Sequence, residues 1–235
     1  MQGYSVAGGN ITRVLILNCD YDRSPKTNGA LLLRGRLAAA GISAVTVKNI
    51  FRGAKVTAAD IRATDAVLIT GSRAPAYERK KWILYLGELV RKLDSAGIPV
   101  LGVCFGFQMV AQSLGGKVAR AASGEEGFGR VTLTPAGRED WLFEGMPSKF
   151  QVYQSHNDVV TRLPKGATKL ASNGHSIQAY SVRGFRCVQF HPEIGVSAAR
   201  TMAIRDGRPA ALGVNSDYTT HYEVISNFIM RLKKK

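Results

Sequence analysis

The sequence has few cysteines, and their arrangement does not indicate a disulfide framework. Three occur, at positions 19, 104 and 187, so their number is odd and their spacing wide. Small oxidised domains carry even, closely spaced sets instead. The sequence also lacks a CxxC or HxxxH pair typical of a zinc site, and we expect neither a metal nor another cofactor. These features favour a reducing compartment, the cytoplasm.

Long apolar runs are also missing. No run approaches the roughly 18–20 residues that span a bilayer, so we expect no membrane segment. The first ten residues, MQGYSVAGGN, have neither the basic region nor the apolar region of a signal peptide, and we interpret residues 1–10 as a short extension. No Gly-, Ser- or Pro-rich linker divides the chain, which predicts a single domain over residues 1–235.

Acidic residues are scarce relative to basic ones. The chain has 32 Lys and Arg against 17 Asp and Glu, a formal net charge of +15. Such a surface attracts an acidic protein partner or nucleic acid. The basic residues are scattered, apart from the terminal RLKKK, and no RNP-like aromatic motif or zinc finger accompanies them. A solvated basic surface is therefore the preferred interpretation, and we do not expect nucleic acid; the oligomeric state stays open.

Short apolar runs alternate with helical patterns in the first half of the chain. This alternation predicts an α/β fold with a largely parallel sheet. The expected strands cover residues 14–17, 42–47, 65–70 and 98–103. The expected helices cover residues 31–40, 82–93 and 107–114.

The second half shows short strand patterns separated by turn residues, which predicts antiparallel hairpins beside the main sheet. The expected strands cover residues 117–122, 129–134, 150–155, 169–171, 177–182 and 186–190. Residues 222–232 carry one apolar helix face, whereas residues 195–215 show no clear pattern.

The sharpest local signal is a cysteine between two glycines, Gly102-Val103-Cys104-Phe105-Gly106. It lies between a predicted buried strand and a predicted helix, where a nucleophile sits on a tight turn and the glycines let the backbone pack closely. The turn exposes the sulfur at the carboxyl end of the sheet, and the helix N-terminus favours its thiolate form. Taken alone, this cysteine is equally well interpreted as a packed core residue.

The second signal is Phe190-His191-Pro192-Glu193. We expect a strand up to Phe190, with His191 at its end. Residues two apart on an extended chain point to the same side, so Glu193 reaches the His191 imidazole. A carboxylate on one ring nitrogen fixes the tautomer and leaves the other nitrogen as a base. Together, Cys104, His191 and Glu193 predict a catalytic triad.

These residues resemble the class I glutamine amidotransferases, the triad-type glutaminases. Four elements carry the resemblance: GVCFGFQ at 102–108 for G-x-C-x-G-x-Q, FHPE at 190–193, QSHND at 154–158 for S-H-x-D, and LITGS at 68–72. The branch similar to the glutaminase domain of GMP synthase, which includes γ-glutamyl-peptide-cleaving members, is favoured by SLGGKV at 113–118 and LPKGA at 163–167. The resemblance implies a flavodoxin-like fold with a mostly parallel central sheet flanked by helices and an additional small antiparallel sheet.

The resemblance also implies a mechanism. Cys104 attacks the γ-carbonyl of glutamine or a related γ-glutamyl compound, and a thioester forms. The N–H of Phe105 and that of Gly71 or Ser72 stabilise the oxyanion. His191 transfers the proton that lets ammonia leave and then activates water, while Glu193 orients it. Arg73 stands where a proline is common in the family, so the oxyanion loop differs from the usual pattern.

Four further residues are predicted to bind the substrate. Gln108 lies about one helical turn after Cys104, so its amide faces the same pocket, with a solvated helix glutamine as the alternative. Ser155, His156 and Asn157 form the opposite wall, mainly through their backbone. For His156 a structural hydrogen bond is an equally good interpretation. Asn157 replaces a glycine that is common in the family.

Several functions remain open from the sequence. The leading hypothesis is a glutaminase that passes ammonia to a separate synthetase, because the chain shows neither a Ser-Gly-Gly-x-Asp loop nor a G-x-x-x-x-G-K-[ST] loop of its own. The second is a stand-alone γ-glutamyl peptide hydrolase. A non-catalytic regulatory module is the third, and the intact triad argues against it. A nucleic-acid binder rests on charge alone.

Overall fold

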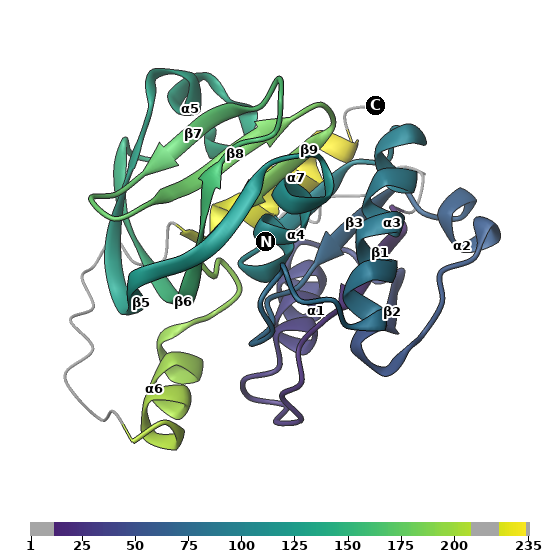
Figure 1. The fold of residues 1–235 in the computed structure, drawn as a ribbon, viewed down its shortest axis with the longest axis horizontal. Helices are drawn as coiled ribbons and strands as arrows, with labels where there is room; N and C mark the ends of the chain where they lie inside the picture. The colour runs from purple at the N-terminus through teal and green to yellow at the C-terminus, as the bar shows by residue number, and fades with distance from the viewer. Residues whose placement is uncertain (1–11, 208–220, 234–235) are drawn as a thin grey trace, which may run out of the picture.

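The computed structural model describes residues 12–207 and 221–233. The interpretation of residues 1–10 as an extension, and the part of 195–215 beyond residue 207, lie outside these ranges. Within them, nine strands form one sheet in the order β2-β1-β3-β4-β9-β8-β7-β5-β6. The chain is an α/β protein, as predicted, and its two halves are visible as the helix-covered and the helix-poor side of the ribbon (Figure 1).

The first five strands in this order run parallel to one another. They are β2 (Val45–Asn49), β1 (Val14–Asn18), β3 (Ala66–Ile69), β4 (Val100–Val103) and β9 (Phe185–Val188). Strand β1 is buried along its whole length, which explains why it is a continuous apolar run rather than an alternating one. The carboxyl ends of these strands meet at one edge, where α/β proteins place their ligand sites.

The remaining strands are antiparallel and continue the same sheet. They are β8 (Ile177–Val182), β7 (Thr168–Ser172), β5 (Lys117–Leu133) and β6 (Lys149–Arg162). The antiparallel strands therefore do not form a separate small sheet, because β9 pairs parallel to β4 on one side and antiparallel to β8 on the other. The two strands expected at 117–122 and 129–134 are one long strand, β5, with a register shift between Arg120 and Glu125.

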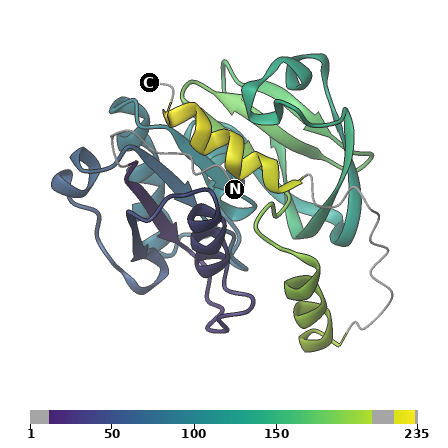
Figure 2. The ribbon, with the colours of Figure 1, turned by 180° about the vertical axis from the view of Figure 1, so that it is seen from behind.

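Helices cover both faces of the parallel strands. Helices α1 (Gly29–Ala39) and α7 (Glu223–Lys233) contact each other on one face (Figure 2), and α3 (Lys81–Ser95) contacts α4 (Phe105–Ser113) on the other. Alternate residues of β1 enter two different cores: Val14 and Ile16 pack with α1 and α7, whereas Leu15 and Leu17 pack with α3 and α4. Gly41 and Gly97, which follow α1 and α3, take the left-handed conformation that ends helices.

The other helical segments are short or peripheral. They are α2 (Ala58–Arg62), α5 (Pro135–Glu139), α6 (Val196–Arg205) and two single turns at Ile50–Arg52 and Trp141–Phe143. Helix α6 projects from the body of the protein, below the ends of β5 and β6 in Figure 1. It occupies part of the stretch for which the sequence showed no clear pattern.

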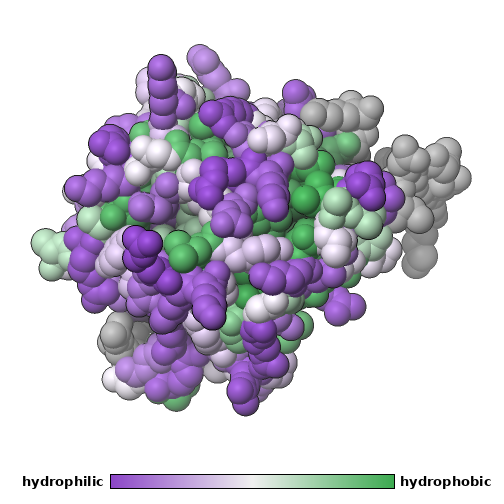
Figure 3. Space-filling model, turned by 45° about the vertical axis from the view of Figure 1, so that its right-hand side comes forward, coloured by the Kyte–Doolittle hydropathy of each residue, from purple (hydrophilic) through white to green (hydrophobic). Residues whose placement is uncertain are grey.

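The surface is largely polar. Figure 3 shows a face on which hydrophilic side chains predominate, with hydrophobic residues in smaller areas between them. In the part of the chain that the structure describes, no helix has both the length and the apolar character needed to cross a membrane.

Candidate active site

Cys104 lies on a strained turn between β4 and α4. Its backbone has φ 51° and ψ −101°, and Arg183 is the other non-glycine residue with positive φ among those described. A non-glycine residue in such a conformation costs of order 1–3 kcal/mol and persists where the surrounding structure enforces it, commonly at functional sites. The Cys104 N–H donates to the Val188 carbonyl of β9 over 2.8 Å, which holds the turn against the sheet.

Two glycines allow the turn, as the sequence predicted. A Cβ on Gly106 would lie 2.5 Å from the Ile69 carbonyl oxygen, and a Cβ on Gly102 would lie 2.8 Å from the Gly106 carbonyl carbon. Both distances are shorter than any real carbon contact. Side chains at these positions would therefore push α4 off β3 and β4, and move Cys104 with it.

Cys104 differs from the other two cysteines in its surroundings. Burial raises the pKa of the Cys187 thiol to about 12, and burial followed by the Asp20 charge raises that of Cys19 further above its usual value. Both therefore stay protonated and inert as nucleophiles at neutral pH. Cys104 lines a pocket instead, with its Sγ 3.8 Å from the Ser155 carbonyl oxygen.

His191 and Glu193 meet as the sequence predicted, but on a different backbone. Strand β9 ends at Val188, and residues 192 and 193 form a turn rather than the expected extended chain. The His191 N–H donates to the Tyr153 carbonyl over 2.9 Å. His191 Nδ1 lies 2.8 Å from Glu193 Oε1, and Glu193 is 1% exposed. This contact leaves Nε2 of the imidazole as the nitrogen available to a nucleophile.

The charges around His191 favour its protonated form. Burial by itself would lower the pKa of His191, but the negative charges of Glu193 and of a Cys104 thiolate, with hydrogen bonds to both, hold that pKa well above its usual value. Cys104 and Glu193 thus act on the imidazole from two directions. A protonated imidazole beside a cysteine sulfur is an arrangement that suits nucleophilic catalysis.

Gly71 packs against His191 and Cys104. It follows β3, and a Cβ on it would lie 3.0 Å from His191 Cε1 and 3.7 Å from Cys104 Cβ. Gly71 and Ser72 line the Cys104 pocket together with Ser155. Phe105 is the first residue of α4, where backbone N–H groups have no intrahelical acceptor. The three predicted oxyanion residues therefore surround Cys104.

Replacing Gly71 with alanine is expected to lower kcat about tenfold. The new methyl would displace the His191 ring by a few tenths of an ångström. Small misplacements of catalytic groups lower the rate of a reaction strongly. Steady-state kinetics of the variant measures this loss. Gly35→Ala on α1 is the matched control, since its Cβ would meet nothing within 4 Å. A Gly71→Ala variant as active as the Gly35→Ala protein would contradict the expectation.

The predicted substrate residues divide into two groups. Ser155 lines the pocket, whereas Gln108, His156 and Asn157 are not among the lining residues. Gln108 is buried, and its Nε2 donates to the Asp158 carbonyl over 2.9 Å and to Gln189 Oε1 over 3.2 Å. The side-chain nitrogen of Gln108 thus donates to protein acceptors rather than to solvent, and contact of this side chain with the substrate stays a prediction.

His156 and Asn157 also point elsewhere. His156 is buried, with its Nε2 3.2 Å from Oε2 of Glu125, but neither ring nitrogen meets a partner with hydrogen-bond geometry, so a structural hydrogen bond of this histidine stays a prediction. The Asn157 side chain is exposed and lies beside Gly124. The predicted contacts of these two residues with the substrate, mainly through their backbone, stay a prediction.

The structure adds pocket residues that the sequence analysis missed. They are Asp20, Asp22, Thr27, Gly29, Ile194, Met202 and Arg205, and Arg73 of the predicted oxyanion loop lines the pocket with them. Burial raises the pKa of Asp20, even though its carboxylate accepts from the Gly29 and Asp22 N–H groups and feels the His191 charge. Asp20 follows β1 at the carboxyl end of a buried parallel strand, and that position was the available signal.

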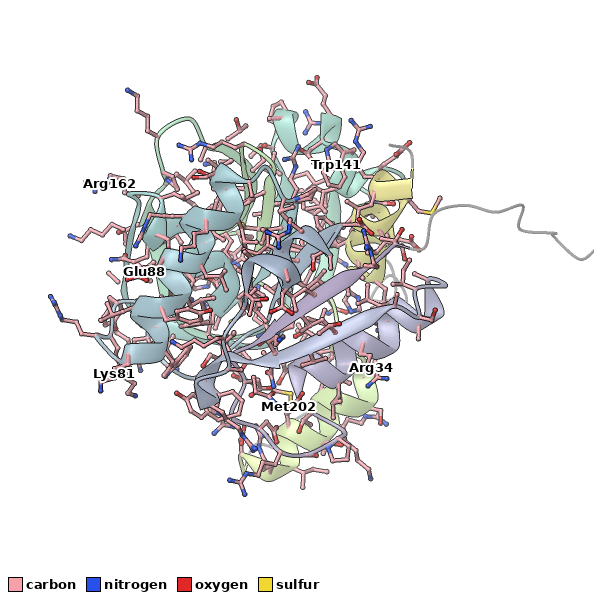
Figure 4. All side chains as sticks on the ribbon, turned by 90° about the vertical axis from the view of Figure 1, so that its right-hand side faces the viewer. Arg34, Lys81, Glu88, Trp141, Arg162 and Met202 are labelled. Atoms are coloured by element: carbon pink, nitrogen blue, oxygen red, sulfur yellow. The ribbon has the colours of Figure 1, made fainter. Side chains whose placement is uncertain are left out.

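Helix α6 reaches the pocket through its C-terminal residues. Arg205 Nη1 lies 2.6 Å from Asp22 Oδ2, and Arg73 lies 3.5 Å from Asp206 Oδ1. These ion pairs connect the C-terminal end of α6 to the segments that follow β1 and β3. Met202 lies on the side of α6 that faces the sheet (Figure 4).

Comparisons with known proteins identify a family and several relatives of this chain. The family model described as glutamine amidotransferase class-I matches residues 31–208. "Gamma-glutamyl peptidase 4" of Arabidopsis thaliana is 37% identical over 139 residues, covering 57% of this chain and 55% of that protein. A glutamine-hydrolysing GMP synthase of Wolinella succinogenes is 32% identical over 171 residues, covering 71% of this chain and 32% of that protein.

A solved structure supports the fold over nearly the whole chain. The crystal structure of a glutamine amidotransferase from Thermotoga maritima superimposes with a TM-score of 0.78 at 22% identity, covering 96% of this chain and 100% of that one. The chain spans about half the length of the plant relative and about a third of the bacterial GMP synthase.

Proposed function

Because this chain belongs to the class-I glutamine amidotransferase family, we propose that it hydrolyses the γ-amide of glutamine or of a related γ-glutamyl compound through a Cys104 thioester. One observation carries the proposal: Cys104 sits on a strained turn beside His191, whose other ring nitrogen is held by a buried Glu193. Nucleophile, base and orienting carboxylate are the three parts that such chemistry needs.

The proposed reaction runs in two halves. The Cys104 thiolate attacks the γ-carbonyl carbon, and the oxyanion is stabilised by Phe105 N–H and by an N–H of the Gly71–Ser72 segment. Protonated His191 gives its proton to the departing nitrogen, so ammonia or an amine leaves and a thioester remains. Neutral His191 then takes a proton from water, which attacks the thioester and releases glutamate. Cys104 and His191 return to their starting state.

For the first candidate, the leaving ammonia passes to a separate synthetase. The glutamine-hydrolysing GMP synthase of Wolinella succinogenes is about three times as long as the part of it that this chain matches. The net charge of +15 supports docking of an acidic partner surface, an association that should weaken as salt is added. The three free cysteines support a reducing, cytoplasmic location.

The second candidate is a γ-glutamyl peptide hydrolase that needs no partner. The 37% identity to a plant γ-glutamyl peptidase favours it, as do Arg73 and Arg205 at the pocket. A γ-glutamyl peptide carries a second carboxylate that glutamine lacks, and guanidinium groups bind carboxylates well.

Glutamate release from glutamine and from γ-glutamyl dipeptides, measured on the purified chain, separates these candidates. Turnover of both classes through one site supports the proposed reaction. A strong preference for dipeptides without any partner favours the peptidase, whereas weak glutamine turnover that rises on adding a synthetase favours the amidotransferase. Complete inactivity on every compound, with and without a synthetase, would favour the regulatory module and refute the proposal.

A further inference from the structure

The peptide between Gly71 and Ser72 has its direction fixed by Thr70. The Thr70 hydroxyl is fully buried, donates to the Gly71 carbonyl over 2.9 Å and accepts from the Cys19 N–H over 2.9 Å. Glycine at position 71 has no Cβ, so its own backbone leaves either orientation of this peptide accessible. The Thr70 hydroxyl, which the Cys19 N–H holds from the β1 side, therefore selects one of the two orientations of the Gly71–Ser72 peptide.

The selected orientation can be followed from the order of the strands. Strand β3 lies between β1 and β4, with Cys19 after β1 and Cys104 after β4. The Gly71 carbonyl points toward the Thr70 hydroxyl, which is held by Cys19. The peptide is trans, so its N–H points the opposite way. The Ser72 N–H is therefore directed to the β4 side, where Cys104 lies.

We propose that Thr70 is a positioning residue that presents the Ser72 N–H, rather than that of Gly71, as the second oxyanion donor. This inference rests on the proposed function and deepens it, and Thr70 itself does not touch the substrate. Ser72 Oγ accepts from the Ala74 N–H over 3.2 Å, a contact that holds the loop that follows this peptide. Without the Thr70 hydroxyl, the Gly71 carbonyl loses its donor and turns its negative end toward the developing oxyanion.

Thr70→Val tests the inference, because valine keeps the shape of threonine and removes the hydroxyl. We expect kcat to fall about 10²-fold with KM little changed, which is the loss seen when one oxyanion donor is removed. Thr70→Ser, which keeps the hydroxyl, should recover most of the activity. Thr64→Val is the matched control, since the Thr64 hydroxyl also donates to a backbone carbonyl, that of Asp60, over 2.8 Å at the end of α2.

A second readout separates oxyanion stabilisation from damage to the nucleophile. Alkylation of Cys104 by iodoacetamide needs the thiolate but no oxyanion donor, so its rate should be the same in Thr70→Val and in the unmodified protein. Alkylation that slows as much as hydrolysis would overturn the inference. Full hydrolytic activity in Thr70→Val would overturn it as well.

The inference can fail independently of the proposed function. A protein that hydrolyses no γ-glutamyl compound refutes the function, yet a crystal structure of Thr70→Val still reports the direction of the Gly71–Ser72 peptide. A Gly71 carbonyl turned toward Cys104 supports the role of Thr70. A carbonyl that keeps its direction without the hydroxyl overturns that role, whatever the protein catalyses.

Discussion

Cys104→Ala is expected to lower glutamate release by about 10⁴-fold or more, because loss of the nucleophile leaves only binding and oxyanion stabilisation to assist water. The same variant should no longer react with iodoacetamide, since Cys19 and Cys187 are fully buried and their thiols stay protonated. Release of glutamate or ammonia under saturating substrate measures the first effect, and labelling followed by mass spectrometry measures the second.

Cys187→Ala is the control for this experiment. It removes another cysteine from a neighbouring strand of the same sheet, and it should leave both the kinetics and the labelling of Cys104 intact while costing some stability. Undiminished turnover in Cys104→Ala would rule out a Cys104 thioester. Parallel loss of activity in both variants would instead indicate that the strand end, rather than the sulfur, is what the substitution disturbs.

Glu193→Gln is expected to lower kcat by about 10²–10⁴-fold and to change its pH dependence. The carboxylate fixes the tautomer of His191 and stabilises its protonated form, and an amide does neither. The Glu193 charge is the larger of the two that raise the pKa of His191, so that pKa should fall in the variant. The alkaline limb of the rate profile, where the imidazolium is lost, should therefore move to lower pH.

The same linkage predicts a pH-dependent loss of stability. The His191 pKa is higher in the folded than in the unfolded chain, so its protonation contributes stability that is fully present below about pH 6.5 and is lost as pH rises through the folded value. Glu193→Gln should therefore reduce the free energy of unfolding more at pH 6 than at high pH.

Glu88→Gln is the charge-matched control for Glu193→Gln, because Glu88 is exposed on α3, away from the site (Figure 4). Denaturant titration at several pH values, together with rate profiles, compares the two variants. An alkaline limb that does not move in Glu193→Gln would show that Glu193 does not set the protonation of His191.

The parallel half of the fold was predictable because its signals are local. Strand β1 is apolar from Val14 to Leu17, and α3 repeats apolar residues at helical spacing and ends at Ser95, shortly before Gly97. The tight turn that carries Cys104 was equally predictable, because contacts with neighbouring backbone require glycine at positions 102 and 106. The contact between His191 and Glu193 was predicted, although it forms in a turn, because their closeness in sequence suffices for either backbone.

The other features of the fold and of the site depend on contacts between segments that are far apart in the sequence. Strand β5 continues through a polar stretch by pairing with β6 from Glu125 onwards. Glu125 also binds Asn173, Ser176 and Gln178 of the β7–β8 hairpin, and no local pattern reveals these contacts. The approach of α6 to the pocket rests on Arg205 and Asp22, and the amide of Gln108 is directed by Asp158 and Gln189. The Thr70 hydroxyl likewise accepts from the N–H of Cys19, a residue that follows a different strand.

Isolation of the acyl-enzyme tests the central claim most directly. Rapid acid quenching during turnover of a γ-glutamyl substrate, followed by mass spectrometry of the intact protein and of its peptides, should show one added glutamyl group. We expect that group on the peptide that contains Cys104, released by hydroxylamine and absent from Cys104→Ala. Rapid turnover with no adduct on Cys104, or an adduct on another residue, would contradict the account.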